Sequence, residues 1–376
     1  MNIRRIAAVS TMAVAGALLV SACGSTSTST TAATATTTPT PAATGNPTSP
    51  VTVTEDGSSL LYPYLEKLAP ALSTAYPNIT LTTAAGGSGK GQSDAEDGNV
   101  TMGGSDAYLS NGAEAEYPRM LNIPIAVSAQ AINYNLPGVS NLKLSGDVIA
   151  KIYQGSITKW NDPAIAALNS GVSLPSTTII PVRRLDSSGD TFIFTSFLSA
   201  TNSAWSSGPN FGTTVSWPGV SDELTASGNP AMVSTCHSTP GCIAYIGVSV
   251  EQTAITDGLG EVNLENKAGA FLVPTQTNIT AAVQAGATNV PSDLRQSLIY
   301  EGGANSYPIV NFEYLIVNRS NVSSATTALA IRTFLSWAID PNGGATATNL
   351  SAVDFVALPS SVVPAVKAGI NSIQVS

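Results

Sequence analysis

The residues best suited to chemistry lie together at positions 183–192, which read Arg-Arg-Leu-Asp-Ser-Ser-Gly-Asp-Thr-Phe. Two guanidinium groups, two carboxylates, three hydroxyls and a glycine therefore fall within ten residues. A β-type run precedes them and an apolar, helix-like run follows, so we expect a strand, a small-residue turn and a helix start. The free N–H groups of a helix start can hold an oxyanion, and an arginine can bind one through two hydrogen bonds. The stretch predicts an anion-binding loop.

Other short polar segments also follow predicted strands. Gly57-Ser58-Ser59 and Gly87-Ser88-Gly89 are turns of the same small, polar composition as Ser187-Ser188-Gly189, and Ser105-Asp106 ends a further strand. Each alone is an ordinary helix cap or tight turn. Together they lie where α/β folds place ligands. The set predicts a site for a small tetrahedral oxyanion.

Carboxylates are unexpected in an anion-binding site, because a carboxylate repels an anion unless it accepts a proton that the anion carries. Phosphate carries protons near neutral pH and sulfate does not. Asp106 is therefore expected to favour phosphate over sulfate. Asp186 is expected to orient Arg184, although the two could equally form a surface ion pair.

Several enzyme classes are excluded by missing residues. A P-loop fails because Ala84 stands where the motif needs glycine and Gly91 where it needs Ser or Thr. Ser88 lacks the surroundings of a nucleophile elbow, and His237 is the only histidine, so Ser-His-Asp hydrolysis lacks its parts. We expect neither catalysis nor a cofactor or metal.

Composition limits the class of protein further. The chain has 376 residues, of which 43% are hydrophobic and 10% charged, enough for two folded domains. Its formal net charge of -9 argues against nucleic-acid binding and means that no broad positive field gathers an anion. Strands, polar turns and helices alternate along the chain, which is typical of α/β folds with helices on both faces of a sheet.

The N-terminal segment has the order of an export signal. Residues 1–22 contain Arg4 and Arg5, a short apolar run and small residues before Cys23. We expect a signal peptide and a lipidated Cys23 at the external face of a bacterial cell membrane, the alternative being a cleaved signal with an incidental cysteine. The rest of the segment 23–50 is almost entirely Ser, Thr, Ala, Pro, Gly and Asn and is predicted to be a flexible tether.

Two cysteines remain, Cys236 and Cys242. In an exported chain they are expected to form one disulfide that closes a small loop. A metal site that includes His237 is the alternative, but three ligands at this spacing match no zinc motif.

Motifs along the whole folded part carry a resemblance to a known family. Residues 182–192 and the run 152–163, Ile-Tyr-Gln-Gly-Ser-Ile-Thr-Lys-Trp-Asn-Asp-Pro, resemble the phosphate-binding subunit of the Pst phosphate ABC transporter, of the periplasmic-binding-protein family. Further matching segments are 104–109, 240–245, 307–309 and 358–363. The resemblance implies an α/β, two-lobed type II fold in which each lobe is a mixed β-sheet flanked by helices. It places one lobe at 51–130 and 304–376 and the other at 131–303.

The resemblance also implies a site between the lobes. Carried over position by position, the phosphate-binding residues are Ser59, Leu60, Ser88, Asp106, Arg184, Ser188, Gly189 and Asp190, with Asp186 supporting Arg184. Ser59 and Leu60 stand where the family often has Thr and Phe. Asp190 stands where some members have Thr, which offers a second proton acceptor.

The function implied is that of a lipid-anchored, monomeric receptor that captures inorganic phosphate and delivers it to the permease subunits of an ABC transporter. A receptor for sulfate or molybdate is one alternative, and Asp106 argues against it. An extracellular phosphatase is the other, and the absence of metal ligands and of a nucleophile with a base argues against that.

Overall fold

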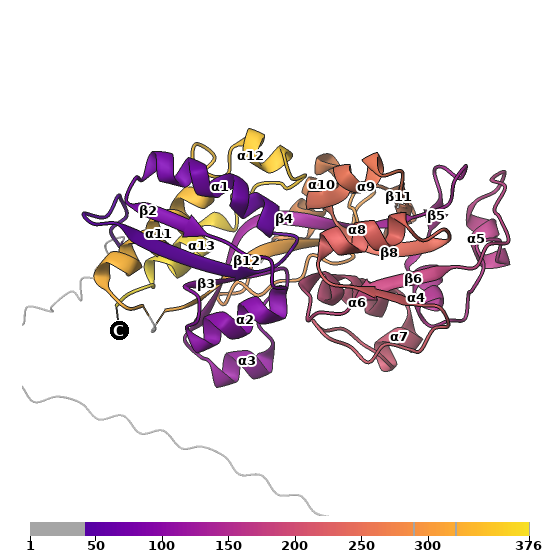
Figure 1. The fold of residues 1–376 in the computed structure, drawn as a ribbon, viewed down its shortest axis with the longest axis horizontal. Coiled ribbons are helices and arrows are strands. Elements are labelled where there is room, and N and C mark those ends of the chain that lie inside the picture. Colours follow the sequence, from indigo (N-terminus) through magenta and orange to yellow (C-terminus); the bar gives the residue numbers. More distant parts are fainter. Residues whose placement is uncertain (1–41, 289, 320–321, 376) are drawn as a thin grey trace, which may run out of the picture. The chain divides into compact units, whose positions relative to one another are not determined.

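The computed structural model describes residues 42–288, 290–319 and 322–375 (Figure 1). The strands are β1 (Val51–Gly57), β2 (Ile79–Thr82), β3 (Met102–Ser105), β4 (Met120–Tyr134), β5 (Lys143–Leu144), β6 (Ile180–Arg184), β7 (Leu224–Ala226), β8 (Cys242–Gly247), β9 (Gly260–Glu261), β10 (Asn263–Glu265), β11 (Phe271–Leu272) and β12 (Val310–Asn318). The helices are α1 (Tyr62–Ala75), α2 (Ser88–Asp97), α3 (Asn111–Glu116), α4 (Gly146–Tyr153), α5 (Pro163–Leu168), α6 (Gly189–Thr201), α7 (Ser203–Ser207), α8 (Asn229–His237), η1 (Val248–Val250), α9 (Glu251–Thr256), α10 (Gln276–Gly286), α11 (Ala325–Ala338), α12 (Ala347–Ser351) and α13 (Val363–Asn371).

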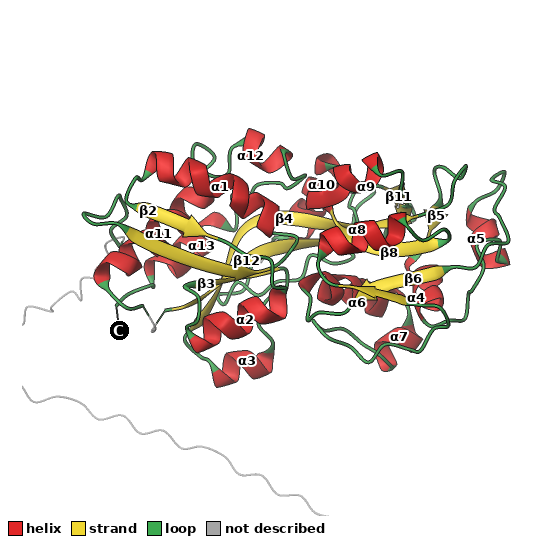
Figure 2. Ribbon diagram, in the orientation of Figure 1, coloured by secondary structure: helices red, strands yellow, loops and turns green. Residues whose placement is uncertain are grey.

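One mixed sheet runs through the described chain in the order β2-β1-β3-β12-β4-β8-β6-β7, with β9 also paired to β4 (Figure 2). β1 is parallel to β2 and β3, whereas β12 is antiparallel to both β3 and β4. At the other end, β6 is parallel to β7 and β8. The sheet therefore has two largely parallel ends joined by an antiparallel middle.

The long strand β4 makes this join. Residues 120–129 of β4 pair with β12, and residues 130–134 pair with β8. All but one of its 15 residues are buried. A strand buried on both faces reads as a nearly continuous apolar run, which is why the sequence shows little alternation here. Because β4 belongs to both ends, the two lobes share it.

Helices cover each lobe as the α/β prediction requires. In the first lobe, α1, α2 and α11 pack on β1–β3, and in the second α6 and α8 pack on β6 and β8 (Figure 1). The chain passes from β1 to α1, from β2 to α2 and from β6 to α6 through short turns. The strand, polar turn and helix start predicted around residues 183–192 are confirmed, and the same order occurs after β1 and β2. The three turns carry most of the predicted site residues.

The start of the folded chain lies earlier than the sequence suggested. Within residues 42–50, the Gly45 N–H donates to Thr333 Oγ1 (2.8 Å), and Thr333 Oγ1 donates back to the Gly45 carbonyl (3.0 Å). Asn46 Oδ1 accepts from the Asn78 N–H at 3.0 Å. This part of the expected tether is thus fastened to α11 and to the residue before β2. The predicted signal peptide and Cys23 lie outside the described residues, and every helix within those residues is too short or too polar to cross a membrane.

The predicted disulfide is confirmed. Cys236, near the end of α8, is bonded to Cys242, the first residue of β8, with Cα atoms 5.3 Å apart. His237 Nδ1 lies 2.6 Å from the Asp257 carbonyl oxygen. Within the described ranges, no three His, Cys, Asp or Glu side chains are arranged to hold a metal ion. The metal alternative at these cysteines is excluded because both sulfur atoms are in the disulfide.

Candidate anion-binding site

Three of the predicted site residues meet where the two lobes face each other. Ser88, the first residue of α2, donates to Asp106 Oδ2 at 3.2 Å and accepts from the Asp106 N–H at 3.2 Å. Gly189, the first residue of α6, comes so close that a methyl group built on it would lie 2.5 Å from both Asp106 Oδ2 and Ser88 Oγ. Gly189 thus allows the start of α6 to approach the opposite lobe.

Arg184 is the buried cation of this site. It ends β6, and only 1% of its side chain is exposed, so it does not form the surface ion pair considered above. Its Nε donates to Asp186 Oδ1 at 2.8 Å, its Nη2 also bonds Asp186, and its Nη1 bonds Asp190. A guanidinium group has five N–H bonds. One N–H therefore remains on each terminal nitrogen, a pair suited to two oxygens of one anion.

Asp186 supports Arg184 as expected. Its two oxygens accept from Nε and Nη2 of the guanidinium group, and Oδ1 also accepts from the Gly228 N–H at 3.3 Å. These hydrogen bonds and the positive charge of Arg184 outweigh partial burial and lower the pKa of Asp186. Asp186 therefore stays ionised and fixes the plane of the guanidinium group.

The carboxyl group of Asp190, expected from the sequence to offer a second proton acceptor, is bonded mainly to protein donors. It is buried and accepts from Arg184 Nη1, from Gln130 Nε2 at 3.1 Å and from Asn229 Nδ2 at 3.0 Å. Burial and the nearby Asp106 raise the pKa of Asp190 to about 7 despite Arg184. With three protein donors already on its oxygens, the carboxyl group of Asp190 serves first to hold Arg184, and one of its four acceptor positions remains for a ligand proton.

Asp106 has the features expected of a carboxyl group that exchanges a proton. It is 2% exposed and accepts from Ser58 Oγ on Oδ1 and from Ser88 Oγ on Oδ2. Burial raises its pKa well above the usual range, and the neighbouring Glu313 raises it further. Asp106 is thus harder to ionise than a free carboxyl group, and two hydroxyl donors are in place to stabilise its ionised form.

Glu313 lies behind Asp106 on β12. Its Oε1 accepts from Ser128 Oγ and from Asn311 Nδ2 (3.0 Å), and it is fully buried. Burial raises the pKa of Glu313 to about 7, although hydrogen bonds from Asp106, Ser128 and Asn311 act in the opposite direction. The site therefore contains more carboxyl groups than cations and must retain protons near neutral pH.

The start of α6 offers backbone donors. Ser188 has extended backbone geometry and caps the helix, since its Oγ accepts from the Thr191 N–H at 3.3 Å. The first N–H groups of a helix have no acceptor within it. The Thr191 N–H is bonded to Ser188 Oγ. The backbone N–H groups of Gly189 and Asp190 are therefore the ones available to an anion. Tyr245 fixes this turn, with its OH 2.9 Å from Thr191 Oγ1 and accepting from the Arg184 N–H at 2.8 Å.

The first turn contributes less than expected. The Leu60 N–H already donates to Ser58 Oγ at 3.0 Å, so this donor is not free in the structure. The Leu60 side chain instead packs on the second lobe, where a methyl group on Gly247 would lie 2.5 Å from Leu60 Cδ1. Ser59 Oγ does lie at the site and accepts two hydrogen bonds from Asn229.

Three residues of the site were not among the sequence candidates. They are Gln130, Asn229 and Glu313. Ser58 lies in one of the predicted polar turns, but its hydrogen bond to Asp106 was not expected from the sequence. For two of the three a signal was present, because Gln130 and Glu313 are polar residues inside largely apolar strands. Such residues are buried only where they have a partner.

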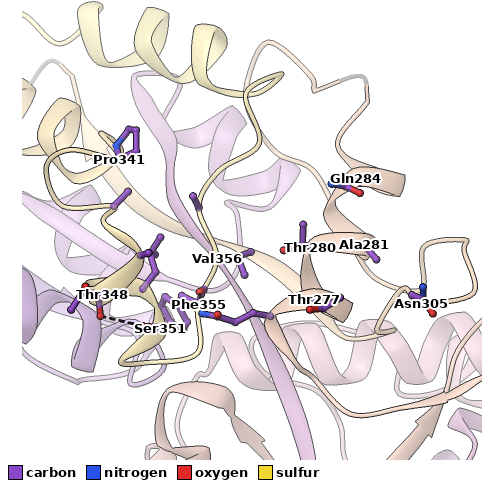
Figure 3. Close-up of a pocket in the computed structure, with 15 residues that line it drawn as sticks. Thr277, Thr280, Ala281, Gln284, Asn305, Pro341, Thr348, Ser351, Phe355 and Val356 are labelled. Atoms are coloured by element: carbon purple, nitrogen blue, oxygen red, sulfur yellow. Dashed lines mark hydrogen bonds between the residues drawn. The ribbon is translucent and has the colours of Figure 1, made fainter.

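A cavity of about 1020 Å³ lies elsewhere, between α10 and the segment around α12. Figure 3 shows Thr277 and Thr280 on one side of it and Ser351 and Phe355 on the other. None of its lining residues is charged. It has no group that could compensate the charge of an anion, so the charged site between the lobes is the better candidate.

Comparisons with known proteins agree with this fold. A family model described as a PBP superfamily domain matches residues 25–342. The phosphate-binding protein PstS of Methanocaldococcus jannaschii is 34% identical over 86% of this chain and 86% of its own length. The phosphate-binding protein PstS 3 of Mycobacterium tuberculosis is 32% identical over 99% of this chain and 100% of its own.

A solved structure shows the same fold. The phosphate-binding protein from Stenotrophomonas maltophilia superposes with a TM-score of 0.63 at 21% sequence identity, covering 85% of this chain and 93% of that one. The two-lobed α/β architecture expected from the sequence is thereby confirmed. The chain belongs to the PBP superfamily, within its family of PstS-type binding proteins.

Proposed function

We propose that this chain is a receptor for inorganic phosphate, held between the two lobes by Ser59, Ser88, Asp106, Arg184, Ser188, Gly189 and Asp190. The observation that carries the proposal is the buried Arg184, which bonds Asp190 in the first turn of α6 and keeps two N–H groups for an anion. The neighbouring Gly189 lies against Asp106. The curated relatives are named phosphate-binding proteins. The family is one of solute-binding proteins, and the chain is accordingly not an enzyme.

The charges of the site favour an anion that carries protons. Arg184 is already flanked by Asp186 and Asp190, with Asp106 beside them, so the cation alone does not outweigh the carboxylates. Phosphate near neutral pH can donate a hydrogen bond to an ionised Asp106, which the hydroxyl groups of Ser58 and Ser88 stabilise. Sulfate has no proton to donate and would face the carboxylate directly.

The direct test is calorimetric competition among phosphate, arsenate and sulfate for the purified full chain. We expect phosphate and arsenate, which carry protons, to compete and sulfate to fail at a large excess. Competition by sulfate as effective as that by phosphate would indicate a general oxyanion receptor. Release of phosphate from a phosphate ester in the same sample would indicate a phosphatase.

Asp106→Asn is expected to narrow the preference for phosphate over sulfate. The amide cannot accept a proton, but its NH₂ group can donate to sulfate, so a contact that repels sulfate becomes favourable. If the gain for sulfate and the loss for phosphate together reach about 1.4 kcal/mol or more, the affinity ratio changes by about tenfold or more. Calorimetry with both anions measures this ratio. An unchanged ratio would place the selectivity in other residues.

We further propose that the chain is exported, anchored by lipid at Cys23 and active as a monomer that delivers phosphate to ABC permease subunits. The sequence of residues 1–23 supports export and lipidation. The disulfide between Cys236 and Cys242 fits an oxidising, extracytoplasmic compartment. Residues 24–41, whose composition is that of a flexible segment, would link Cys23 to the folded chain.

Metabolic labelling tests the anchor. A labelled fatty acid is expected to mark the wild type and not the Cys23→Ala variant, because thioether attachment requires the Cys23 sulfur. Cys236 and Cys242 serve as an internal control, since both sulfurs are in the disulfide. Equal labelling of wild type and variant would show that the anchor lies elsewhere.

A further inference from the structure

Asn229 makes an unusually complete set of hydrogen bonds at the centre of the site. It is fully buried at the start of α8. Its N–H and Nδ2 both donate to Ser59 Oγ, at 3.0 and 3.2 Å, and Nδ2 also donates to Asp190 Oδ2 at 3.0 Å. Its Oδ1 accepts from the Gly247 N–H at 2.8 Å. That last bond fixes which end of the amide donates, because a backbone N–H requires the oxygen.

These bonds connect the two lobes. Asn229, Asp190 and Gly247 belong to elements of the second lobe, α8, α6 and β8, whereas Ser59 follows β1 in the first. The bonds to Asp190 and Gly247 can persist when the lobes separate. Those to Ser59 exist only while the lobes are together, so they report closure.

The contact also determines what the Ser59 hydroxyl can offer. A serine hydroxyl has two acceptor positions and one hydrogen to donate. The two bonds from Asn229 fill both acceptor positions. Only the hydrogen of Ser59 is left, so in the closed protein this hydroxyl acts as a donor, as an anion requires.

We propose that Asn229 is a positioning residue that couples closure of the lobes to retention of the anion. When the lobes close, its two hydrogen bonds to Ser59 Oγ leave that hydroxyl able only to donate. Its hydrogen bond to Asp190 also fixes the position of the carboxyl group that bonds Arg184. This inference rests on the proposed phosphate-binding function. Because the Ser59 contact forms only after the lobes meet, Asn229 governs phosphate release rather than capture.

The test is stopped-flow measurement of phosphate association and dissociation for the full chain and for Asn229→Ala. We expect dissociation to be about tenfold faster, equivalent to about 1.4 kcal/mol, with association within about twofold of the wild type. Asn229→Asp keeps the acceptor for Gly247 but loses both Nδ2 donations, and it should change the rates in the same direction. It replaces the alanine variant if that one does not fold.

Asn169→Ala is the matched control. Asn169 is also a buried asparagine of the second lobe, but its amide bonds only the backbone of Lys143 and Ile165. The Asn169→Ala substitution should lower the melting temperature of the phosphate-free protein and leave the rate of phosphate dissociation unchanged. If the Asn229 variants behave in the same way, Asn229 is merely structural and the inference is wrong.

A double substitution tests the route through Ser59. If Asn229 acts partly through this hydroxyl, Ser59→Ala combined with Asn229→Ala should speed dissociation by less than the product of the single effects. Fully multiplicative effects would contradict the route. Failure of the wild type to bind phosphate at all would instead contradict the proposed function, and the inference with it.

Discussion

Replacing Arg184 with alanine is expected to weaken phosphate binding by about a hundredfold or more, the largest effect of any single substitution in the site. Two N–H groups of this cation are free for the anion, and each charge-assisted hydrogen bond contributes about 1.5 to 3 kcal/mol. The variant would also leave the anion facing Asp186 and Asp190 without their cation. Calorimetry with phosphate measures the loss, and an affinity within about threefold of the wild type would remove Arg184 from the site.

The same substitution should destabilise the phosphate-free protein. Asp190 is fully buried and would lose its charged partner, a change that costs about 3 to 5 kcal/mol in comparable buried pairs. Protonation of Asp190 would offset part of this cost, so the destabilisation should be larger at pH 8 than at pH 5. Urea unfolding at both pH values gives the two free energies.

Two variants serve as controls. Arg183→Ala removes the neighbouring cation, which pairs with Glu223 at 2.8 Å and lies over the Trp217 ring, outside the site. It should leave phosphate affinity unchanged. Arg184→Lys keeps the charge but cannot bond both carboxylates and the anion in one plane, so it should recover more stability than affinity.

The sequence predicted those parts of the fold in which local and long-range interactions agree. In α1 the residues spaced four apart, Tyr64, Leu68 and Leu72, are all buried, and apolar residues at this spacing predict a helix with one buried face. β6, the polar turn and α6 were likewise predicted from adjacent residues. Short-range patterns suffice there because each element presents one continuous apolar face or run.

Helix α2 shows where such patterns fail. Its first turns contain Gly89 and Gly91, which are poor helix formers. The structure explains them by close packing, since a methyl group would lie 2.0 Å from Ser187 Oγ at Gly89 and 2.6 Å from the Asp56 carbonyl oxygen at Gly91. Tertiary contacts therefore override helix propensity, and a single sequence does not reveal those contacts.

The site was only partly predictable for a related reason. Arg184, Asp186 and Asp190 are close in sequence, so their cluster was visible at once. Asn229 lies far along the chain from both Ser59 and Asp190. It is an inconspicuous residue between a glycine and a proline, and only its hydrogen bonds to Ser59 of the opposite lobe and to Asp190 give it a role.

The second large effect is on the pH dependence of stability. Burial raises the pKa of Asp190 and Glu313 to about 7 and those of Glu55 and Glu251 to about 8. In the unfolded chain these carboxyl groups titrate near pH 4. Between about pH 4 and 8 the folded protein thus binds more protons than the unfolded chain, and the free energy of unfolding must fall as the pH rises.

Each pKa unit corresponds to about 1.36 kcal/mol, so we expect the phosphate-free protein to lose about 3 kcal/mol or more between pH 5 and pH 8. Asp186, whose pKa is lowered, acts in the opposite direction, and the stability it contributes is lost below about pH 4. The free energy of unfolding should therefore be largest near pH 5. Urea unfolding in phosphate-free buffers from pH 4 to pH 8 would show it.

Glu313→Gln separates the site from the other buried acids. Glutamine keeps the shape of the side chain but does not titrate, so the variant should lose stability less steeply between pH 5 and pH 8 than the wild type. The variant's free energy of unfolding should exceed that of the wild type by most near pH 8, where the wild type carries buried negative charge on both Glu313 and Asp190. If the free energy of unfolding fell equally steeply with pH in variant and wild type, Glu313 would not titrate in this range. The raised pKa of Asp106 would then not depend on the charge of Glu313.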